Sequence, residues 1–245
     1  MTTHNGPVRR IQAGPVRLAF RTWGIARAPG VKPPPGAIPP APLVLLHALG
    51  EDSSDWEAVA ATLAPSWRVY APDLRGHGAS DWSGPYTVEQ LTADLEAFLD
   101  ALGLRRVALA GHSMGAAAAY LFAARNPNRV TRLILEEPPP PFPRPPVARE
   151  RPAEPTAIDW DATALSDELT DPPSAWRDSL REIKVPALLI AGGPGSHLDD
   201  GRLPEMAALI PSCELTTIEA GHLVHASRPA EFAEAVAAFL SKSLP

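Results

Sequence analysis

The strongest constraint on the fold of this 245-residue chain is the alternation of short apolar runs with longer stretches of helical spacing. Continuous apolar runs such as Leu43–Leu46, Val107–Ala110 and Ala187–Ala191 are typical of strands buried on both faces of a parallel sheet. Between them, Val88–Leu102 and Met114–Arg125 have the apolar periodicity of helices. Strands that alternate with helices predict a mostly parallel, doubly wound α/β sheet.

The remaining segments extend this pattern over the whole chain. Two strands at its start, Val8–Ile11 and Val16–Trp23, are joined by a Gly-Pro turn and predict a hairpin. The other predicted strands are Trp67–Ala71, Leu133–Leu135 and Glu214–Ile218, and the other predicted helices are Trp56–Leu63, Pro204–Ile210 and Ala230–Leu240. We therefore expect a single α/β domain over residues 1–245.

Two proline-rich segments interrupt the alternation, Pro29–Pro42 and Pro138–Pro155, in a chain with 30 prolines. Proline breaks helix interiors and cannot donate a ladder hydrogen bond, so both segments are predicted as connections. The second segment opens an insertion at about residues 138–184, in which Ile158–Leu169 and Ser174–Ile183 are predicted as short helices. We expect this insertion to form a small cap.

The composition and net charge limit the classes of molecule that the chain is expected to bind. Hydrophobic residues make up 45% and charged residues 20% of the sequence, which is typical of a globular protein. The net charge is -6 without a basic block, which argues against nucleic acid and an anionic membrane surface as partners. Because we find neither a signal peptide nor about 18 consecutive apolar residues, we expect a cytoplasmic protein. The sequence does not predict an oligomeric state.

The pentapeptide Gly111-His112-Ser113-Met114-Gly115 matches the pattern G-x-S-x-G. The pattern alone is weakly specific, but here a predicted strand precedes it and an alanine-rich helix follows it. A sharp turn from strand to helix holds its serine in a strained, exposed conformation, and small flanking residues let the backbones approach. This context indicates a nucleophilic serine.

Three other segments agree with that interpretation. A strand ends in His47-Ala48-Leu49-Gly50, a Gly-rich loop covers Asp73–Ser80, and Ala220-Gly221-His222 follows the last strand. Together with the pentapeptide, and in this order, these motifs resemble the α/β-hydrolase superfamily from Val16 to Leu240, in its serine-nucleophile, esterase- and lipase-like branch.

The resemblance implies a role for each matching residue. Ser113 corresponds to the nucleophile and His222 to the general base, with the backbone N–H groups of Leu49 and Met114 as the oxyanion hole. This chain has Ala48 where the family usually has glycine. No cofactor and no metal is implied.

The acid that orients the base is missing from its usual position. In most of the superfamily an Asp follows the strand that corresponds to Ala187–Ala191, and the matching position here is Gly195. In some relatives, including certain haloalkane dehalogenases, the acid follows the preceding strand, which corresponds to Glu137. Strand alternation sends Glu136 and Glu137 to opposite sides, so one of them can reach the base. Asp199 and Asp200 are the alternative acids, and a site without a functional acid is the third possibility.

Several other residues are candidates for the substrate pocket. They share a place in the loops expected around the nucleophile or in the insertion: His47, Phe142, Trp160, Trp176 and His197. For the aromatic residues of the insertion, the alternative is that they pack the cap onto the body of the domain.

We therefore expect a serine hydrolase that cleaves a small carboxylic ester or related acyl substrate through an acyl-enzyme intermediate. The same fold also supports C–C bond hydrolysis, lactone opening, perhydrolysis and acyl transfer, which the sequence does not separate. A non-catalytic ligand-binding relative is the remaining alternative, supported by Gly195 alone.

Overall fold

The structure is a computed structural model that describes residues 7–24, 41–146, 151, 156–198 and 201–243. Most of the first proline-rich segment and parts of the second lie outside the described residues. Asp199 and Asp200, the alternative acids, also lie outside them.

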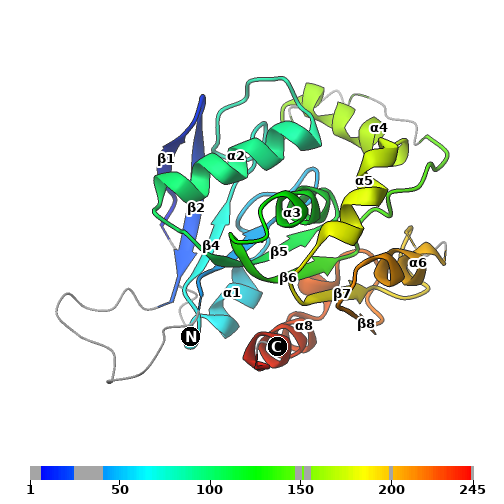
Figure 1. Cartoon of the computed structure of the whole chain (residues 1–245). Helices are drawn as coiled ribbons and strands as arrows, with labels where there is room; N and C mark the ends of the chain where they lie inside the picture. The colour runs from blue at the N-terminus through cyan, green and yellow to red at the C-terminus, as the bar shows by residue number, and fades with distance from the viewer. Residues whose placement is uncertain (1–6, 25–40, 147–150, 152–155, 199–200, 244–245) are drawn as a thin grey trace.

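The described residues form one eight-stranded sheet with the order β1-β2-β4-β3-β5-β6-β7-β8 (Figure 1). The strands are β1 (Arg9–Ala13), β2 (Val16–Trp23), β3 (Leu43–Leu46), β4 (Val69–Pro72), β5 (Val107–His112), β6 (Val130–Glu136), β7 (Ala187–Ala191) and β8 (Cys213–Thr217). β2 pairs antiparallel with β1 and β4, and every other neighbouring pair is parallel. The predicted fold class, a mostly parallel α/β sheet, is confirmed.

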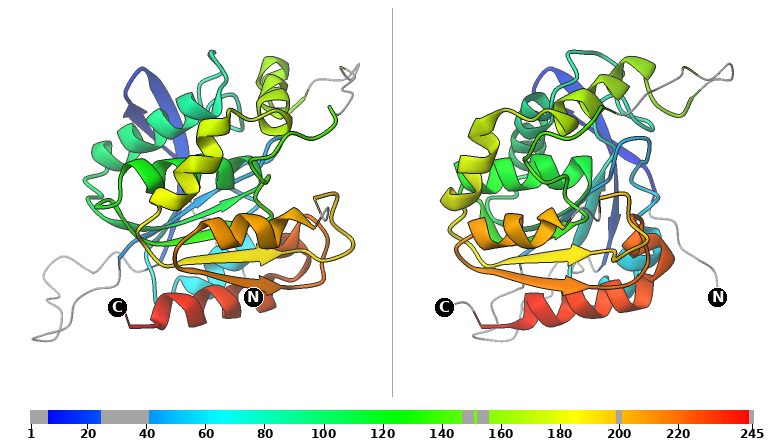
Figure 2. Two further views of the ribbon diagram at one scale, coloured as in Figure 1. Left: turned by 45° about the vertical axis from the view of Figure 1, so that its right-hand side comes forward. Right: turned by 90° about the vertical axis from the view of Figure 1, so that its right-hand side faces the viewer.

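Helices cover both faces of the sheet (Figures 1 and 2). The main helices are α1 (Glu57–Leu63), α2 (Val88–Ala101), α3 (Met114–Arg125), α6 (Arg202–Leu209) and α8 (Pro229–Ser241), and a short α7 (Val224–Ser227) precedes α8. Helices α2 and α3 pack on one face, whereas α1 and α8 pack on the other. None of the described helices is long and apolar enough to cross a membrane.

The strands at the centre of the sheet feed two separate cores. Leu109 of β5 belongs to the core under α2 and α3, whereas its neighbours Ala108 and Ala110 belong to the core under α1 and α8. Because successive side chains of a strand point to opposite faces, burial on both faces requires apolar residues without alternation. This explains the continuous apolar runs in the sequence.

The insertion packs on the side of the sheet that carries α3. It contains η1 (Trp160–Ala164), α4 (Leu165–Thr170), α5 (Ser174–Ser179) and η2 (Leu180–Glu182). The Trp176 ring meets the Tyr120 ring of α3 edge to face at 6.4 Å, and the Tyr86 hydroxyl donates to Asp159 at 2.6 Å. Each predicted helix of the insertion therefore forms as a short α-helix joined to a turn of 3₁₀-helix.

Candidate active site

Ser113 occupies the sharp turn between β5 and α3. Its backbone has φ 48° and ψ -113°, outside the conformations that L-residues ordinarily adopt. A Cβ at Gly111 would lie 2.4 Å from the Gly115 carbonyl oxygen, and a Cβ at Gly115 would lie 2.5 Å from that of Leu46. The turn therefore needs both glycines, and the surrounding close packing holds the strained serine in place.

Glu137 is the second strained residue, at the end of β6. Ser113 and Glu137, with φ 48° and 45°, are the non-glycine residues of positive φ in the described part of the chain. The two strands are neighbours, and the Ser113 N–H donates to the Glu136 carbonyl at 3.0 Å. Backbone strain of this kind concentrates at functional sites, which makes the carboxyl edge of these two strands the candidate site.

The Glu137 carboxylate reaches the His222 ring. Its Oε2 lies 3.2 Å from His222 Nδ1 and accepts a hydrogen bond from the Ser196 hydroxyl, while Oε1 accepts from the Gly192 N–H. Burial alone would raise the pKa of Glu137, but hydrogen bonds from His222, Ser196 and Gly192 outweigh it and hold the pKa below its ordinary value. The carboxylate is therefore ionised and fixes the tautomer and orientation of the imidazole.

Gly195 lies beside the backbone of Gly221, which precedes His222. A Cβ built on Gly195 would come within 3.5 Å of Gly221 Cα, the residue that precedes His222. This is ordinary van der Waals contact, and no positive φ accompanies it, so the site tolerates a side chain. An acid at Gly195 would approach His222 from β7, whereas Glu137 approaches it from β6.

Two more histidines surround His222. The His197 ring, which is exposed, lies 4.1 Å from the His222 ring, and the buried His112 ring lies 4.7 Å from it. Burial, and then the neighbouring His222, lowers the pKa of His197. Among the residues that the structure describes, no hydrogen bond joins the Ser113 hydroxyl to the His222 ring, and such contacts often tighten when substrate binds.

The backbone at the end of β3 and the start of its loop, Leu46 and His47, lies against Gly115, two residues after Ser113. In the described part of the chain, neither the Leu49 N–H nor the Met114 N–H has a hydrogen-bond acceptor, so both are free to bind an anionic oxygen. His47 is fully buried: its Nδ1 donates to the Ala48 carbonyl at 2.7 Å and its Nε2 accepts from the Leu74 N–H at 2.8 Å. The imidazole of His47 thus braces the loop.

The aromatic residues of the insertion lie mostly in packed environments. Phe142 is buried, with the guanidinium groups of Arg177 and Arg202 at 5.5 and 5.3 Å from its ring centre. Trp176 is also buried, and Trp160 is half-buried. In this structure Phe142 and Trp176 fasten the insertion to the body.

A second cluster of charged groups lies on the other side of the strand ends, and the sequence analysis missed it. His225 Nδ1 lies 2.8 Å from Glu136 and its Nε2 lies 2.5 Å from Asp55, while the ring stacks on Trp56 at 4.0 Å. Burial alone would lower the pKa of His225, but Glu136 and Asp55 raise it to about 10. In the sequence, the consecutive pair Glu136-Glu137 could have indicated this cluster, because neighbouring strand residues place one carboxylate on each side of the sheet.

Comparison with known proteins agrees with this architecture. The profile of the family described as alpha/beta hydrolase fold matches residues 41–157, which include the loop after β3 and the strained serine. The chain has the α/β-hydrolase fold.

The individual proteins that this chain resembles differ in their chemistry. Lipase LipV of Mycobacterium tuberculosis is 38% identical over 99 residues, 40% of this chain and 38% of its own length. N-formylmaleamate deformylase of Pseudomonas putida is 27% identical over 226 residues, 74% of this chain and 82% of its own. The solved enol-lactonase of Burkholderia xenovorans is 26% identical with a TM-score of 0.77, covering 96% of this chain and 100% of its own. This chain thus matches little more than a third of the length of LipV.

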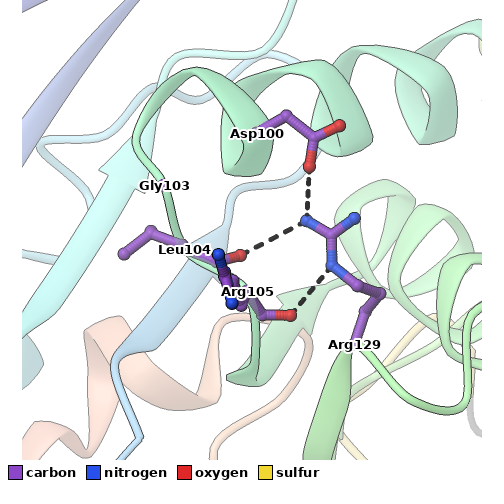
Figure 3. Close-up of a pocket in the computed structure, with 5 residues that line it drawn as sticks. All are labelled: Asp100, Gly103, Leu104, Arg105 and Arg129. Carbon is purple, nitrogen blue, oxygen red and sulfur yellow. Dashed lines mark hydrogen bonds and ion pairs between the residues drawn. The ribbon is translucent and has the colours of Figure 1, made fainter.

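A pocket in this protein lies before the start of β5, at the opposite end of the strand from Ser113 (Figure 3). It is lined by Asp100, Gly103, Leu104, Arg105 and Arg129. The Arg129 guanidinium donates to Asp100 at 2.7 Å and to the Leu104 and Arg105 carbonyls at 3.3 and 2.9 Å. These bonds engage its cation within the protein, and the pocket does not contribute to the candidate site.

Proposed function

We propose that this α/β hydrolase is a serine hydrolase that cleaves a small carboxylic ester or related acyl substrate through an acyl-enzyme intermediate. Ser113 is the nucleophile, His222 the general base and Glu137 the acid that orients it, a relocation from the usual position at Gly195. The insertion at about residues 138–184, which directly follows Glu137, forms a cap on the single domain.

In the proposed reaction His222 Nε2 removes the Ser113 hydroxyl proton as Oγ attacks the carbonyl carbon of the substrate. The Leu49 and Met114 N–H groups stabilise the oxyanion of the tetrahedral intermediate, and the charged imidazolium is stabilised by Glu137. His222 then protonates the leaving alkoxide, and the Ser113 acyl ester remains. A water molecule, deprotonated by His222, releases the acid product in the second half of the cycle.

The observation that carries this proposal is the contact between Glu137 and His222 at the strand end next to Ser113. Oε2 to Nδ1 is 3.2 Å, and the carboxylate is buried and held by two further hydrogen bonds. A carboxylate held in this way keeps the hydrogen of His222 on Nδ1 and leaves the second ring nitrogen, Nε2, as the base for proton transfer.

Burst kinetics test the proposal. With p-nitrophenyl acetate and butyrate, we expect a burst of p-nitrophenol and an acyl adduct on Ser113 detected by intact mass. Ser113→Ala should remove the adduct and lower kcat roughly 10⁴- to 10⁶-fold. Ser179→Ala, whose hydroxyl bonds the Ala175 carbonyl on an exposed helix, is the matched control and should behave as wild type. Equal rates for both variants would contradict the proposal.

Lactone opening is a second candidate, favoured by the likeness to the enol-lactonase over almost the whole chain. It uses the same nucleophile and oxyanion hole but retains the leaving group in the acyl product. A panel that compares kcat/KM for p-nitrophenyl esters, an enol-lactone and a C–C cleavage substrate separates these activities. A preference for esters of at least tenfold supports the first candidate.

A further inference from the structure

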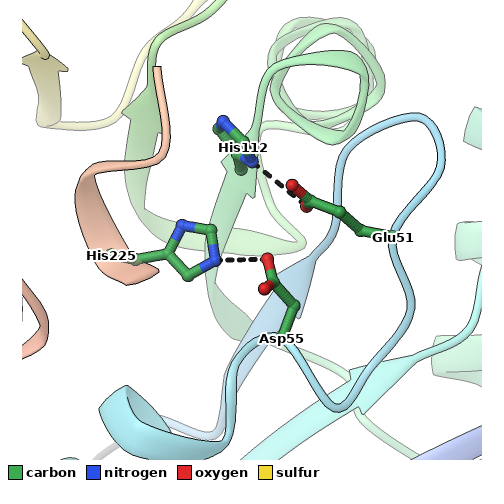
Figure 4. Close-up of side chains that lie close together, drawn as sticks. All are labelled: Glu51, Asp55, His112 and His225. Atoms are coloured by element: carbon green, nitrogen blue, oxygen red, sulfur yellow. Dashed lines mark hydrogen bonds and ion pairs between the residues drawn. The ribbon is translucent and has the colours of Figure 1, made fainter. Parts of the chain in front are cut away.

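The charged groups behind the catalytic edge form a compact set that the proposed reaction does not use. Glu51, Asp55, His112 and His225 each offer one nitrogen or oxygen atom, and these four atoms all lie within 4.8 Å of one another. Figure 4 shows the His112 ring facing Glu51 and the His225 ring facing Asp55. We call these four residues the lower cluster.

Both imidazoles of the lower cluster are fixed through their other nitrogen. His112 Nε2 lies 2.9 Å from the His222 carbonyl oxygen, which can only accept, so this nitrogen carries the hydrogen. His225 Nδ1 lies 2.8 Å from the Glu136 carboxylate, and Trp56 stacks on the ring. A histidine that ligates a metal almost always donates its second nitrogen to a carbonyl or carboxylate, as these two do.

The other nitrogen of each imidazole lies close to a carboxylate oxygen, as metal ligands do. His112 Nδ1 lies 3.2 Å from Glu51 Oε2, and His225 Nε2 lies 2.5 Å from Asp55 Oδ2. The Asp55 and Glu51 side chains also interact directly, which brings two carboxylates together. In the metal-free protein hydrogen bonds from the two imidazoles hold these carboxylates, and a bound metal ion would take the place of the shared protons.

Burial of the lower cluster leaves a path for an ion. The His112 and His225 side chains are 0% exposed, whereas those of Glu51 and Asp55 are 18% and 27% exposed. An ion would enter from the carboxylate side and meet two rings held rigidly from behind. The Ala48 N–H also holds Glu51 Oε2, at 2.9 Å.

We propose that the lower cluster binds one divalent first-row transition metal ion, with Zn²⁺ as the best match to two imidazoles and two carboxylates. Tetrahedral coordination at about 2.0–2.1 Å places donor atoms about 3.3 Å apart. The His112–Glu51 pair already has this spacing, and the partly exposed Asp55 moves back to accommodate the ion. Four protein ligands close the coordination sphere, so the ion is structural.

This site links three parts of the candidate active site. Glu51 lies in the same loop as Leu49, His112 precedes Ser113, and His225 lies in the short helix α7 that follows His222. An ion bound here fixes their relative positions from below. The inference holds whether or not Ser113 proves to be the nucleophile, because it needs only the lower cluster.

The test is a titration of chelator-treated, full-length protein with Zn²⁺ alone, followed by metal analysis after dialysis and by thermal unfolding. We expect one tightly bound equivalent and a raised Tm. Asp55→Asn and Glu51→Gln should weaken the binding at least tenfold, and Glu136→Gln, which removes the carboxylate charge behind the two imidazoles, should weaken it about ten- to a hundredfold.

Asp52→Asn is the matched control, because the Asp52 carboxylate lies in the same loop but accepts from the Ser54 N–H at 2.7 Å. It should bind Zn²⁺ as wild type does. His197→Ala should also keep the full equivalent, which excludes binding at the His197–His222 pair. If wild-type protein binds no stoichiometric metal, or if Asp55→Asn binds as tightly as Asp52→Asn, the lower cluster holds ion pairs only and the proposal is wrong.

Discussion

The two sides of the β5 and β6 strand ends carry similar pairs of residues in different surroundings, the proposed catalytic side and the lower side. On the catalytic side Glu137 pairs with His222, and on the lower side Glu136 pairs with His225. On the lower side both partners are 0% exposed, and the histidine is held through both nitrogens; on the catalytic side the His222 side chain is 18% exposed. The partial exposure of His222, and the absence of a partner for its Nε2 among the described residues, suit it to proton transfer. The buried His225, with both nitrogens engaged, is not suited to that role.

Consecutive residues reach opposite sides because a strand alternates its side chains. The positive φ of Ser113 and Glu137 then turns each of them away from the strand direction at the catalytic edge. His112 and Glu136, which precede them, remain within the strands and point below. Two adjacent strand ends thus contribute four residues to two sites, one on each side.

The largest expected effect is on catalysis. Glu137→Gln removes the charge that stabilises the His222 imidazolium and favours the wrong tautomer, so kcat should fall roughly 10²- to 10⁴-fold. KM should change much less, because the carboxylate does not contact substrate. Steady-state kinetics on the preferred ester measure this split, and a loss under threefold would contradict the assignment of the acid.

The same substitution on the lower side should act on stability. Glu136→Gln leaves the buried His225 beside one carboxylate, and breaking a buried pair costs about 3 kcal/mol or more. Glu137→Gln should cost less, because His222 is partly solvated. Urea unfolding of both variants compares the two costs, and equal values would show that the two sides are not energetically distinct.

A smaller effect is expected from restoring an acid at the usual position. Gly195→Asp added to Glu137→Gln should recover kcat about tenfold, because its side chain points at the loop of His222 without a clash. Gly195→Asn in the same background keeps the shape and lacks the charge, so it should recover nothing. Recovery by both variants, or by neither, would argue against His222 as the group that the acid orients.

The smallest effect is the acid dependence of stability. The folded-state pKa of Glu137 lies below its ordinary value of 4.5, so its stabilisation is complete above pH 4.5 and is lost as the pH falls through the lowered pKa. The stability gap between wild type and Glu137→Gln should therefore shrink below pH 4.5. Unfolding curves at stepped pH measure it, and a gap that widens in acid has the wrong sign.

Local pattern was sufficient to predict most of the fold. The strands Leu43–Leu46 and Ala187–Ala191 and the helix Met114–Arg125 have the predicted boundaries, since each is an unbroken apolar or alanine-rich run. The strand Val16–Trp23 also has its predicted boundaries, although polar residues interrupt it. The four-residue helix α7 was missed, because so short a segment has no periodicity to read.

Sequence could predict those residues of the candidate site that end or directly follow a strand and belong to a recognisable motif. Ser113, Glu137 and His222 each end a strand or follow one, so their meeting at one edge could be expected. Glu51 and Asp55 lie in an irregular loop, and their approach to His112 and His225 depends on packing that no sequence spacing records. Likewise, burial of Trp176 against α3 separates a packing aromatic from a pocket aromatic only in three dimensions.

The central claim is that His222 activates Ser113 for covalent chemistry, and labelling with a fluorophosphonate tests it most directly. Intact mass should record one adduct per chain, mapped by peptide sequencing to Ser113, with labelling slowed at least a hundredfold in His222→Ala. Folded wild-type protein that stays unlabelled, or an adduct that forms equally fast without His222, would contradict the account.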